Sequence, residues 1–428
     1  MSTPARPATG PASTAEPFSA RLLDFLAEFL PTLLVALAIL PLVIRGGNYA
    51  PWAPQTTDLE VYVYAAADLL AGKDVYQTQS PLGLWFIYPP IAAILMIPLV
   101  VGPYVVWQVI WTALLVLAQN SVLKRCGVPR GWKLVLVSIA LIIAMEPIRT
   151  TLGYGQVNTM LMFLVIADLL PDRPGEKRLI PRGALIGLAA SIKLTPLLFL
   201  VFLGLLGRFR AVVVGTLTFI ALTVIGAVFM WQGTVEFFTG LLGGDTKTSG
   251  PQYVGNQSLV GVSARLLGET TTATLVGLGV AAVVALASVL VAAYWWRRGE
   301  KVFAVGLCGI ATCLASPLSW THHWVWIVPL GIACLTSNEL PRWVRGTGAF
   351  LALWVAACLP LSLLPYGSGA ADSYDALQQI VANLGPLLGV VIALGLAVTW
   401  LTDRRRPTVS HDTISPTGTD GRSAEEPV

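Results

Sequence analysis

Two acidic residues, Asp58 and Glu60, lie in the first long polar stretch of the chain, residues 45–90, which follows an apolar run. A carboxylate beside an apolar surface can have its basicity tuned by burial and by neighbouring charges, which suits a general base. Two other interpretations stay open. Thr57 or Asp58 could cap a helix that begins near Leu59, and Asp58-x-Glu60 resembles half of a metal site that lacks further oxygen ligands. We therefore predict a base at Asp58 and no metal.

A pair of histidines, His322 and His323, is the second candidate for chemistry. They are the only histidines outside the C-terminal tail, and tryptophans flank them at Trp320 and Trp324. Neighbouring residues on a helix project to different faces, so at most one of the two can point into a site. A histidine that donates a hydrogen bond or carries charge could hold a phosphate. The alternative is a polar patch within an aromatic belt at a membrane surface.

Four amide side chains and one lysine complete the candidates. The amides occur as two pairs after glycine, Gln156 with Asn158 and Asn256 with Gln257. An amide donates and accepts at once, which suits sugar hydroxyls, although Asn and Gly also cap helices. Lys193, in the segment Lys-Leu-Thr-Pro, could bind a lipid phosphate as a point charge. Alternatively its aliphatic stem lies along apolar surface while the ammonium reaches water.

The composition indicates which elements must position these side chains. Of 428 residues 55% are hydrophobic and 12% are charged, and the mean hydropathy is +0.72. Apolar runs approach the roughly 20 residues that cross a bilayer, and only helices or closed barrels satisfy their backbone there. We predict an all-α polytopic membrane protein without a separate soluble domain. The net charge of +4 comes from short basic clusters at the ends of runs, so it does not indicate nucleic-acid binding. The five cysteines show neither a disulfide framework nor metal spacing.

The apolar runs predict about 12 spans within a membrane domain of residues 29–402. Residues 1–28 and 403–428 are expected to be disordered cytoplasmic segments, and residues 45–90 the first extracytoplasmic loop. Residues 59–71 have a helical pattern, and residues 85–101 read as a re-entrant or surface piece because prolines interrupt them. The predicted spans are residues 29–44, 104–122, 134–148, 157–170, 183–193, 195–207, 211–231, 272–296, 302–317, 323–336, 343–364 and 384–402.

The charge distribution gives this arrangement an orientation. With both termini inside and 183–207 as a hairpin of two short helices, every Lys/Arg cluster between spans falls on the cytoplasmic side. A single long span there would bury Lys193 in mid-membrane, at about 2.5–3.5 kcal/mol. In the hairpin arrangement Asp58, Lys193, His322 and the amide pairs all fall on the extracytoplasmic face. We expect a multi-pass protein of the plasma membrane whose chemistry occurs outside.

Six short motifs in this order resemble those of a known family, the actinobacterial polyprenol-phosphate-mannose-dependent α-1,2-mannosyltransferases, which are GT-C glycosyltransferases. The resemblance covers roughly residues 30 to 400, and within the family it is strongest to the enzymes that elongate phosphatidylinositol mannosides. The motifs are Asp58 in the first outer loop, Tyr88-Pro89-Pro90, Gly155-Gln156-Val157-Asn158, Lys193-Leu194-Thr195-Pro196, Gly255-Asn256-Gln257-Ser258-Leu259 and Ser316-Pro317-Leu318-Ser319-Trp320-Thr321-His322-His323.

The resemblance implies a GT-C fold with a catalytic Asp58 and no cofactor. It implies a polyprenyl-phosphate mannose donor, a phosphatidylinositol mannoside acceptor in the bilayer, and inversion at the anomeric carbon. His322, with Lys193 and His323, would face the donor phosphate, and Glu60 and the four amides would contact sugars or the acceptor. The family's acid often belongs to a carboxylate pair, so the role of Glu60 stays open. The alternatives are a related transferase that uses a lipoglycan acceptor or lipid-linked arabinose, and a transporter of lipid-linked sugars.

Overall fold

The computed structural model describes residues 18–44, 56–171, 178–243, 250–367 and 369–404. Most of the predicted N-terminal segment and tail lies outside these ranges. Within them every regular element is a helix, and the extended backbone pairs only as two isolated bridges, Gln79 with Trp85 and Asn256 with Trp320. The prediction of an all-α protein is therefore confirmed for the described part of the chain.

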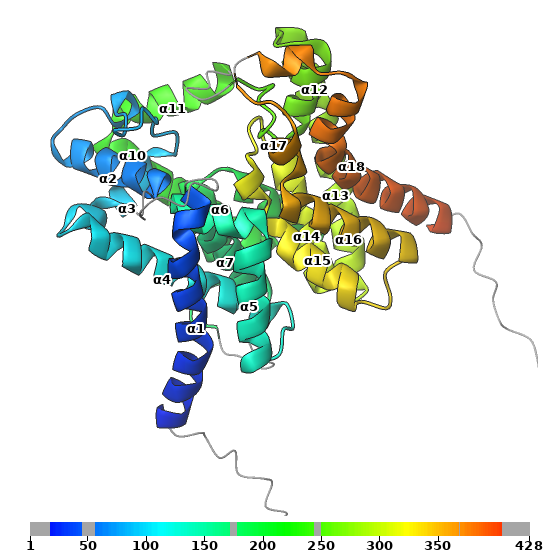
Figure 1. Ribbon diagram of the computed structural model, residues 1–428, viewed down its shortest axis with the longest axis horizontal. Coiled ribbons are helices and arrows are strands. Elements are labelled where there is room, and N and C mark those ends of the chain that lie inside the picture. The colour runs from blue at the N-terminus through cyan, green and yellow to red at the C-terminus, as the bar shows by residue number, and fades with distance from the viewer. Residues whose placement is uncertain (1–17, 45–55, 172–177, 244–249, 368, 405–428) are drawn as a thin grey trace, which may run out of the picture.

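Most helices of the first half overlap the predicted apolar runs (Figure 1), whereas the helix over residues 231–243 was not predicted and the predicted span 134–148 is broken at residue 145. The first helix begins before residue 29, because its leading turns are rich in Leu, Ala and Glu, which favour helix. Residues 85–101 form only short pieces, as their prolines suggested. The elements are α1 Phe18–Ile44, α2 Thr57–Leu70, η1 Val75–Gln77, α3 Pro90–Leu95, η2 Ile97–Val100, α4 Tyr104–Arg125, α5 Trp132–Ala144, α6 Glu146–Tyr154, α7 Asn158–Leu169, α8 Ala184–Ile192, η3 Thr195–Leu197, α9 Leu198–Leu205, α10 Phe209–Phe229 and α11 Trp231–Gly243.

The second half packs beside the first, and in Figure 1 helices α13 to α18 form a group on the opposite side from α1 to α5. The two groups meet where α6 and α7 pack against η4 and where α9 packs against α13. The elements are α12 Leu259–Leu267, α13 Thr271–Arg297, α14 Lys301–Ala315, η4 Thr321–Trp326, α15 Ile327–Thr336, α16 Arg342–Ala357, α17 Leu359–Leu363, η5 Ala370–Ser373 and α18 Ala376–Arg404.

Five of the described helices are long and apolar enough to cross a membrane: α1, α4, α10, α13 and α18. A sixth crossing exists if α5 and α6, which bend by 79° at their junction, count as one span. The bend lies at Met145, whose backbone is extended (φ −94°, ψ 102°). Pro147 lies in the first turn of the next helix, where its missing N–H would be unpaired anyway. The other predicted spans are shorter helices. α7, with 12 residues, is about 18 Å long and falls short of a bilayer core of about 30 Å.

The hairpin predicted for residues 183–207 is confirmed by how its two arms pack on α10. An ideal Cβ on Gly183 would lie 2.0 Å from the carbonyl oxygen of Ala211, and one on Gly187 would lie 2.3 Å from that of Gly215. Helix α8 therefore runs parallel to α10 at a closeness that only glycine permits. On α9, Leu200 lies beside Gly215 and the later residue Gly204 lies beside Val212, so α9 runs antiparallel to α10. Lys193 occupies the turn between the arms.

The predicted site residues and the basic clusters lie at opposite ends of the bundle. Tyr104, at the start of α4, hydrogen-bonds to Thr56 beside the acidic stretch. At the other end of this 22-residue helix, about 32 Å away, the Nζ atom of Lys124 lies 3.9 Å from a carboxylate oxygen of Glu28. Helix α7 repeats the arrangement, beginning at Asn158 and ending beside Asp168, which contacts Arg178. This separation matches the expected grouping of the polar motifs on one face.

Candidate active site

Thr56 fixes the start of helix α2 and so the position of Asp58. Its backbone is left-handed (φ 37°, ψ 56°), which is uncommon for a residue with a Cβ. Two side chains of α4 hold it there: Tyr104 Oη lies 2.7 Å from Thr56 Oγ1, and Gln108 Nε2 donates to the same oxygen at 2.9 Å. Thr56 is the cap residue, and Asp58 lies inside the first turn. The interpretation of Thr57 or Asp58 as the helix cap is therefore wrong, and the Asp58 carboxylate is available for other contacts.

The carboxylate of Asp58 lies against polar groups from separate segments of the chain. Gln156 hydrogen-bonds to it, and the positive charge of Lys193 acts on it. Burial nevertheless dominates and raises the pKa of Asp58 to about 6, because a buried carboxylate loses hydration that its partners only partly replace. Such a carboxylate is ionised at neutral pH and is basic enough to accept a proton from a hydroxyl group as a bond forms.

Two tyrosines extend this network from Asp58 toward the hairpin turn. Tyr62, one helical turn after Asp58, donates from its hydroxyl to that of Tyr88 at 2.9 Å. Gln156 Nε2 donates to the same Tyr88 hydroxyl at 2.8 Å. The ring of Tyr88 in turn lies beneath the ammonium of Lys193, whose Nζ is 5.7 Å from the ring centroid. Burial raises the pKa of both tyrosines, so they act as neutral hydrogen-bonding groups.

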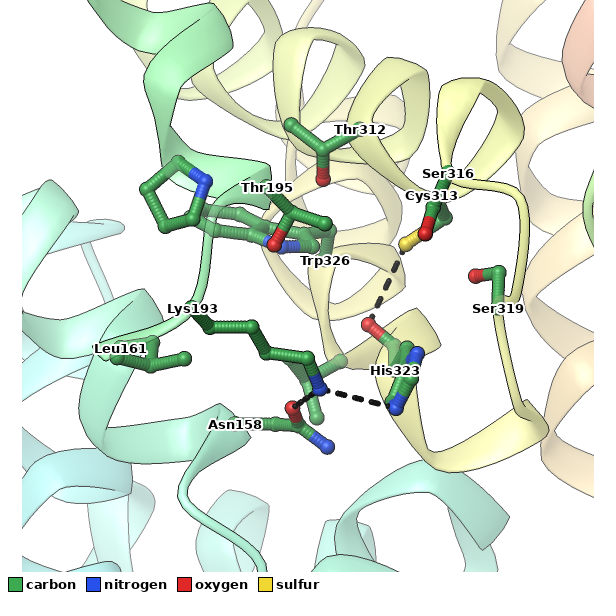
Figure 2. A pocket seen from close by; sticks show the side chains of 12 residues that line it. Asn158, Leu161, Lys193, Thr195, Thr312, Cys313, Ser316, Ser319, His323 and Trp326 are labelled. Carbon is green, nitrogen blue, oxygen red and sulfur yellow. Dashed lines mark hydrogen bonds between the residues drawn. The ribbon is translucent and has the colours of Figure 1, made fainter. Parts of the chain in front are cut away.

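Lys193 is the positive charge of the site. Its backbone is extended (φ −151°, ψ 130°), which ends α8 and turns the side chain toward η4. Nζ donates to Asn158 Oδ1 at 3.1 Å and lies 3.0 Å from His323 Nε2, as Figure 2 shows. A lysine ammonium has no acceptor capacity, so Nε2 of His323 accepts and the ring is neutral. Lys193 also lines the adjacent cavity.

The two histidines point in different directions, as their adjacency predicted. Their rings are almost perpendicular (89°) with centroids 4.8 Å apart. His323 faces Lys193, whereas the ring of His322 packs edge-on against Tyr154 at 5.5 Å. The Nε2 atom of His322 is buried and has no hydrogen-bond partner among the described residues. Its backbone carbonyl accepts from Asn158 Nδ2 at 2.9 Å and from Thr151 Oγ1 at 3.2 Å. His323 is thus the histidine that joins the charged cluster directly.

A cavity adjoins Lys193 and His323 between α7, α14 and η4 (Figure 2). Thr195, Ser316, Ser319 and Trp326 line it with hydroxyl groups and one aromatic face. Its volume of about 20 Å³ holds roughly one water molecule.

The second amide pair lies outside this cluster. Asn256 Oδ1 accepts from the backbone N–H of Ser319 at 2.9 Å, and its Nδ2 donates to the carbonyl of Pro317 at 3.2 Å. Gln257 Nε2 donates to the carbonyls of Val254 at 2.7 Å and Ala382 at 3.1 Å. Both amides therefore join backbone segments and fix the loop before η4. Glu60 lies two residues after Asp58 in α2, half-buried, and burial raises its pKa.

Five of the predicted residues lie together in one cluster: Asp58, Gln156, Asn158, Lys193 and His323. The amides of Asn256 and Gln257 and the imidazole of His322 lie outside this cluster. Thr56, Tyr62 and Tyr88 also belong to the site, although the sequence did not predict a role in it for their side chains. The only available signal for Tyr62 was its position four residues after Asp58 in a predicted helix, where side chains are neighbours. In the described part of the chain no three His, Cys, Asp or Glu side chains gather as metal ligands.

A comparison with known protein families now bears on this arrangement. The model of glycosyltransferase family 87 matches residues 86–317. The chain belongs to glycosyltransferase family 87. The matched region contains Gln156, Asn158 and Lys193, whereas Asp58 precedes it and the histidines follow it. As a family 87 protein the chain is a glycosyltransferase, and its apolar helices identify it as a membrane protein.

Relatives of this family 87 chain match it over a longer stretch than that region. The chain is 32% identical over 367 residues to a polyprenol-phosphate-mannose-dependent alpha-(1-2)-phosphatidylinositol mannoside mannosyltransferase of Mycolicibacterium smegmatis, covering 76% of this chain and 81% of the relative. It is 35% identical over 321 residues to a polyprenol-phosphate-mannose-dependent alpha-(1-2)-phosphatidylinositol pentamannoside mannosyltransferase of Mycobacterium tuberculosis, covering 69% and 71%. No solved structure matches the chain.

Proposed function

We propose that the protein transfers mannose from polyprenyl-phosphate mannose to the 2-hydroxyl of a mannose on a phosphatidylinositol mannoside, with inversion at the anomeric carbon. The observation that carries this proposal is that a carboxylate, Asp58, and an ammonium, Lys193, lie within electrostatic reach of each other in one half-buried cluster. Segments far apart in the chain supply a base and a phosphate-binding cation, the two groups that such a transfer requires. The names of the relatives supply the sugar, the lipid donor and the acceptor.

In the proposed reaction Asp58 accepts the proton of the acceptor's 2-hydroxyl as its oxygen attacks the anomeric carbon. The bond from that carbon to the donor phosphate breaks on the opposite side, and polyprenyl phosphate leaves with the electron pair. One carboxylate suffices because phosphate departs without protonation. An inverting hydrolase instead uses two carboxylates that flank the scissile bond.

Lys193 stabilises the phosphate as negative charge accumulates on it. Asn158 and His323 hold the ammonium with two hydrogen bonds, so the charge is oriented before the donor enters. Preorganised charge in a site shielded from water stabilises a transition state far more than the same charge in solvent. His322, whose Nε2 has no partner in the described structure, adds a neutral imidazole near this cluster.

The remaining predicted residues act on the sugars or on the shape of the site. Gln156 holds the Asp58 carboxylate and the Tyr88 hydroxyl together and orients the base toward the acceptor. Glu60 faces the acceptor entrance near the start of α2. Asn256 and Gln257 act through the loop that they fix, since their amides are bonded to backbone groups. The prenyl tail lies between helices.

We also propose the finer fold and placement that the resemblance implies: a GT-C architecture with about 12 membrane-crossing or membrane-embedded segments in the plasma membrane. The site then faces the extracytoplasmic side. The opposite positions of the Asp58 end and the basic end of the bundle support this orientation.

The decisive experiment replaces Asp58 by Asn, which keeps the size of the side chain and removes its basicity. Purified Asp58→Asn protein should bind polyprenyl-phosphate mannose normally and transfer mannose about 10²–10⁴-fold more slowly, the usual contribution of a general base. Radiolabelled donor and a phosphatidylinositol mannoside acceptor give the rate, and linkage analysis of the product gives the stereochemistry.

The matched control is Asp68→Asn in the same helix. Asp68 forms a surface ion pair with Lys73 at 3.1 Å, far along α2 from the site, and surface pairs contribute little. Its activity should stay within about threefold of wild type. Near-normal turnover by Asp58→Asn protein would refute the base assignment. If the wild-type protein forms a product with another sugar or acceptor, the chain is a related transferase with a different substrate.

A further inference from the structure

A second cavity lies on the other side of η4 from Lys193. Thr321 and Trp324 of η4, Trp354 of α16, Gly385 of α18 and Gln257 line it. A 3₁₀-helix has three residues per turn, so side chains three apart share a face. Thr321 and Trp324 therefore face this second cavity, whereas His323 and Trp326 face the first one. The short motif that bears the histidines separates two cavities of different character.

Two of the side chains that line the second cavity, Trp324 and Trp354, have hydrogen-bond donors without a partner among the described residues. The indole Nε1 atoms of Trp324 and Trp354 are both buried without a partner in the described part of the chain, and Trp324 is only 1% exposed. Buried N–H groups in folded proteins almost always find an acceptor. Two unpaired donors around one cavity indicate that a ligand supplies acceptor oxygens there.

The chemistry of the lining defines that ligand. Among the described residues no Lys, Arg or His faces the second cavity, so it lacks the cation that a buried phosphate needs. Its volume of about 20 Å³ suits a single hydroxyl or hydroxymethyl group, by comparison with the space of about one water molecule. Aromatic and aliphatic walls with a few donors are typical of sites for neutral polar molecules.

The second cavity is also connected to the catalytic cluster. Thr321 donates to Glu146 Oε1 at 2.9 Å and directly precedes His322. The same helix α6 that begins at Glu146 ends at Tyr154, which packs on the His322 ring and lies within electrostatic reach of Asp58. Helix α6 therefore connects Thr321, which lines the second cavity, to Tyr154 near the base.

We propose that this second cavity is a subsite for a hydroxyl-bearing edge of an acceptor sugar, whose oxygen accepts hydrogen bonds from the Trp324 and Trp354 indoles. This inference rests on the proposed function, because it assigns the neutral sugar of the acceptor to this cavity and the donor phosphate to the cavity at Lys193. The subsite orients the acceptor mannose without touching the reacting atoms.

Two variants test the subsite by different physical means. Trp354→Phe keeps an aromatic ring and removes the N–H donor. Gly385→Ala places a methyl group in the cavity, since an ideal Cβ there lies 3.1 Å from Gln257 Oε1 and 3.4 Å from Trp354 Cδ1. Thermal unfolding of each is measured as well, because a Cβ directly before Pro386 is disfavoured in a helix.

The controls repeat each change on the same helix away from the cavity. Gly389→Ala lies one turn further along α18 and meets Leu314 Cδ1 at the same 3.1 Å. Trp343→Phe lies on α16, where the ring packs against Gly395 of α18. Neither residue lines the second cavity, so both control proteins should keep the wild-type KM for each substrate.

Steady-state kinetics with donor and acceptor varied separately distinguish the outcomes. We expect Trp354→Phe and Gly385→Ala to raise the KM for a phosphatidylinositol mannoside about five- to tenfold, the effect of losing one good hydrogen bond. The KM for polyprenyl-phosphate mannose should stay unchanged. An unchanged acceptor KM in both variants, or an equal rise in the two KM values, would overturn the subsite; the first result means that the cavity holds only water.

Equilibrium binding of the phosphatidylinositol mannoside to purified protein bearing Asp58→Asn separates this inference from the proposed function, because binding needs no turnover. Weaker binding after Trp354→Phe or Gly385→Ala supports the subsite even if product analysis contradicts mannose transfer. Unchanged binding overturns the subsite even if transfer by the wild-type protein is observed.

Discussion

At the scale of single residues, the properties of Asp58 follow from opposed effects on one carboxyl group. Burial favours the neutral form, while the Gln156 hydrogen bond and the charge of Lys193 favour the carboxylate. The resulting pKa of about 6 leaves the group ionised at pH 7. An exposed aspartate with a pKa near 3.9 would be a weaker base by about a hundredfold in its proton affinity.

This balance predicts the pH dependence of transfer. Asp58 acts in its deprotonated form, so kcat/KM should fall about tenfold per unit below pH 6. Burial lowers the pKa of Lys193 to about 8, so kcat/KM should also fall above pH 8 as the ammonium loses its proton. Replacing Lys193 by Met removes a charge that lowers the pKa of Asp58, so the acidic limb should move to higher pH as the rate falls. Initial rates from pH 4.5 to 8.5 test these statements. A wild-type rate independent of pH down to 5 would contradict the prediction.

Lys73→Met is the matched control for that shift. Lys73 is mostly exposed and pairs with Asp68, and it is not among the groups that act on Asp58. Its acidic limb should coincide with that of wild type. A purely structural effect of Lys193→Met would lower the rate without moving the limb.

Residue types singled out Asp58, Lys193, Gln156 and Asn158 as candidates, because charges and amides are rare in an apolar chain. Their partners could not be predicted. Asn256 and Asn158 have the same side chain after similar glycine motifs, yet Asn256 bonds to backbone groups of Ser319 and Pro317 while Asn158 binds Lys193. That difference depends on tertiary contacts between segments far apart in the chain, which one sequence does not reveal.

At the scale of elements, the contact between α6 and α2 connects the Gly-Gln-Val-Asn motif to the base. Gly155 ends α6 in the left-handed region (φ +68°), and an ideal Cβ there would lie 2.8 Å from Leu59 Cβ. Its carbonyl accepts from the Trp111 indole at 2.7 Å. The glycine therefore lets the start of α2 approach Gln156 closely.

Gly155→Ala should consequently damage both stability and catalysis. The left-handed backbone costs about 1 kcal/mol for a residue with a Cβ, and overpacking against Leu59 adds roughly 1–3 kcal/mol. Since the clash pushes on the residue next to Asp58, transfer should fall at least about tenfold, as expected for a misplaced catalytic group. Thermal unfolding in detergent and initial rates are measured together.

Gly127→Ala isolates the backbone contribution. Gly127 has φ +90° and no described atom within 4 Å of an ideal Cβ, so the substitution brings strain without a clash. Its stability should fall by only about 1 kcal/mol and its activity should remain. Equal losses in the two alanine variants would show that contact with Leu59 is unimportant.

Helix positions were predictable from the apolar runs, but helix types were not. Residues 323–336 were predicted as one span, whereas the structure begins with the 3₁₀-helix η4 and changes to α15 at Ile327. Apolar composition is similar in both forms. The choice depends on packing against α6 and α14, and it decides which cavity each of Thr321, His323 and Trp324 faces.

At the scale of the whole molecule, the number of crossings is the part least determined by sequence. Hydropathy detected the apolar runs correctly, but a run of 12 residues such as α7 satisfies a hydropathy criterion without the length to cross alone. Five described helices have the necessary length, or six with the bent pair. The shorter helices pack against other helices of the bundle and do not cross the bilayer by themselves.

The proposed orientation predicts which loops are reached from outside the cell. The five cysteines are buried, so wild-type protein gives a low labelling background. Leu82→Cys, at a position 56% exposed in the loop after η1, should react with a membrane-impermeant maleimide in intact cells. Leu179→Cys, at a position 98% exposed beside Arg178, should react only after permeabilisation. The reverse labelling pattern would show that the protein has the opposite orientation in the membrane.

The carbonyl group of His322 has a consequence for any mutational scan of this enzyme. Asn158 and Thr151 bind that peptide oxygen, and every amino acid placed at position 322 presents the same oxygen. Alanine there would report only on the ring, and the part of His322 that anchors the lysine-binding amide would stay intact in every variant. Loss of these hydrogen bonds should therefore be detected only through substitutions at positions 151 and 158, in helices of the other half of the molecule.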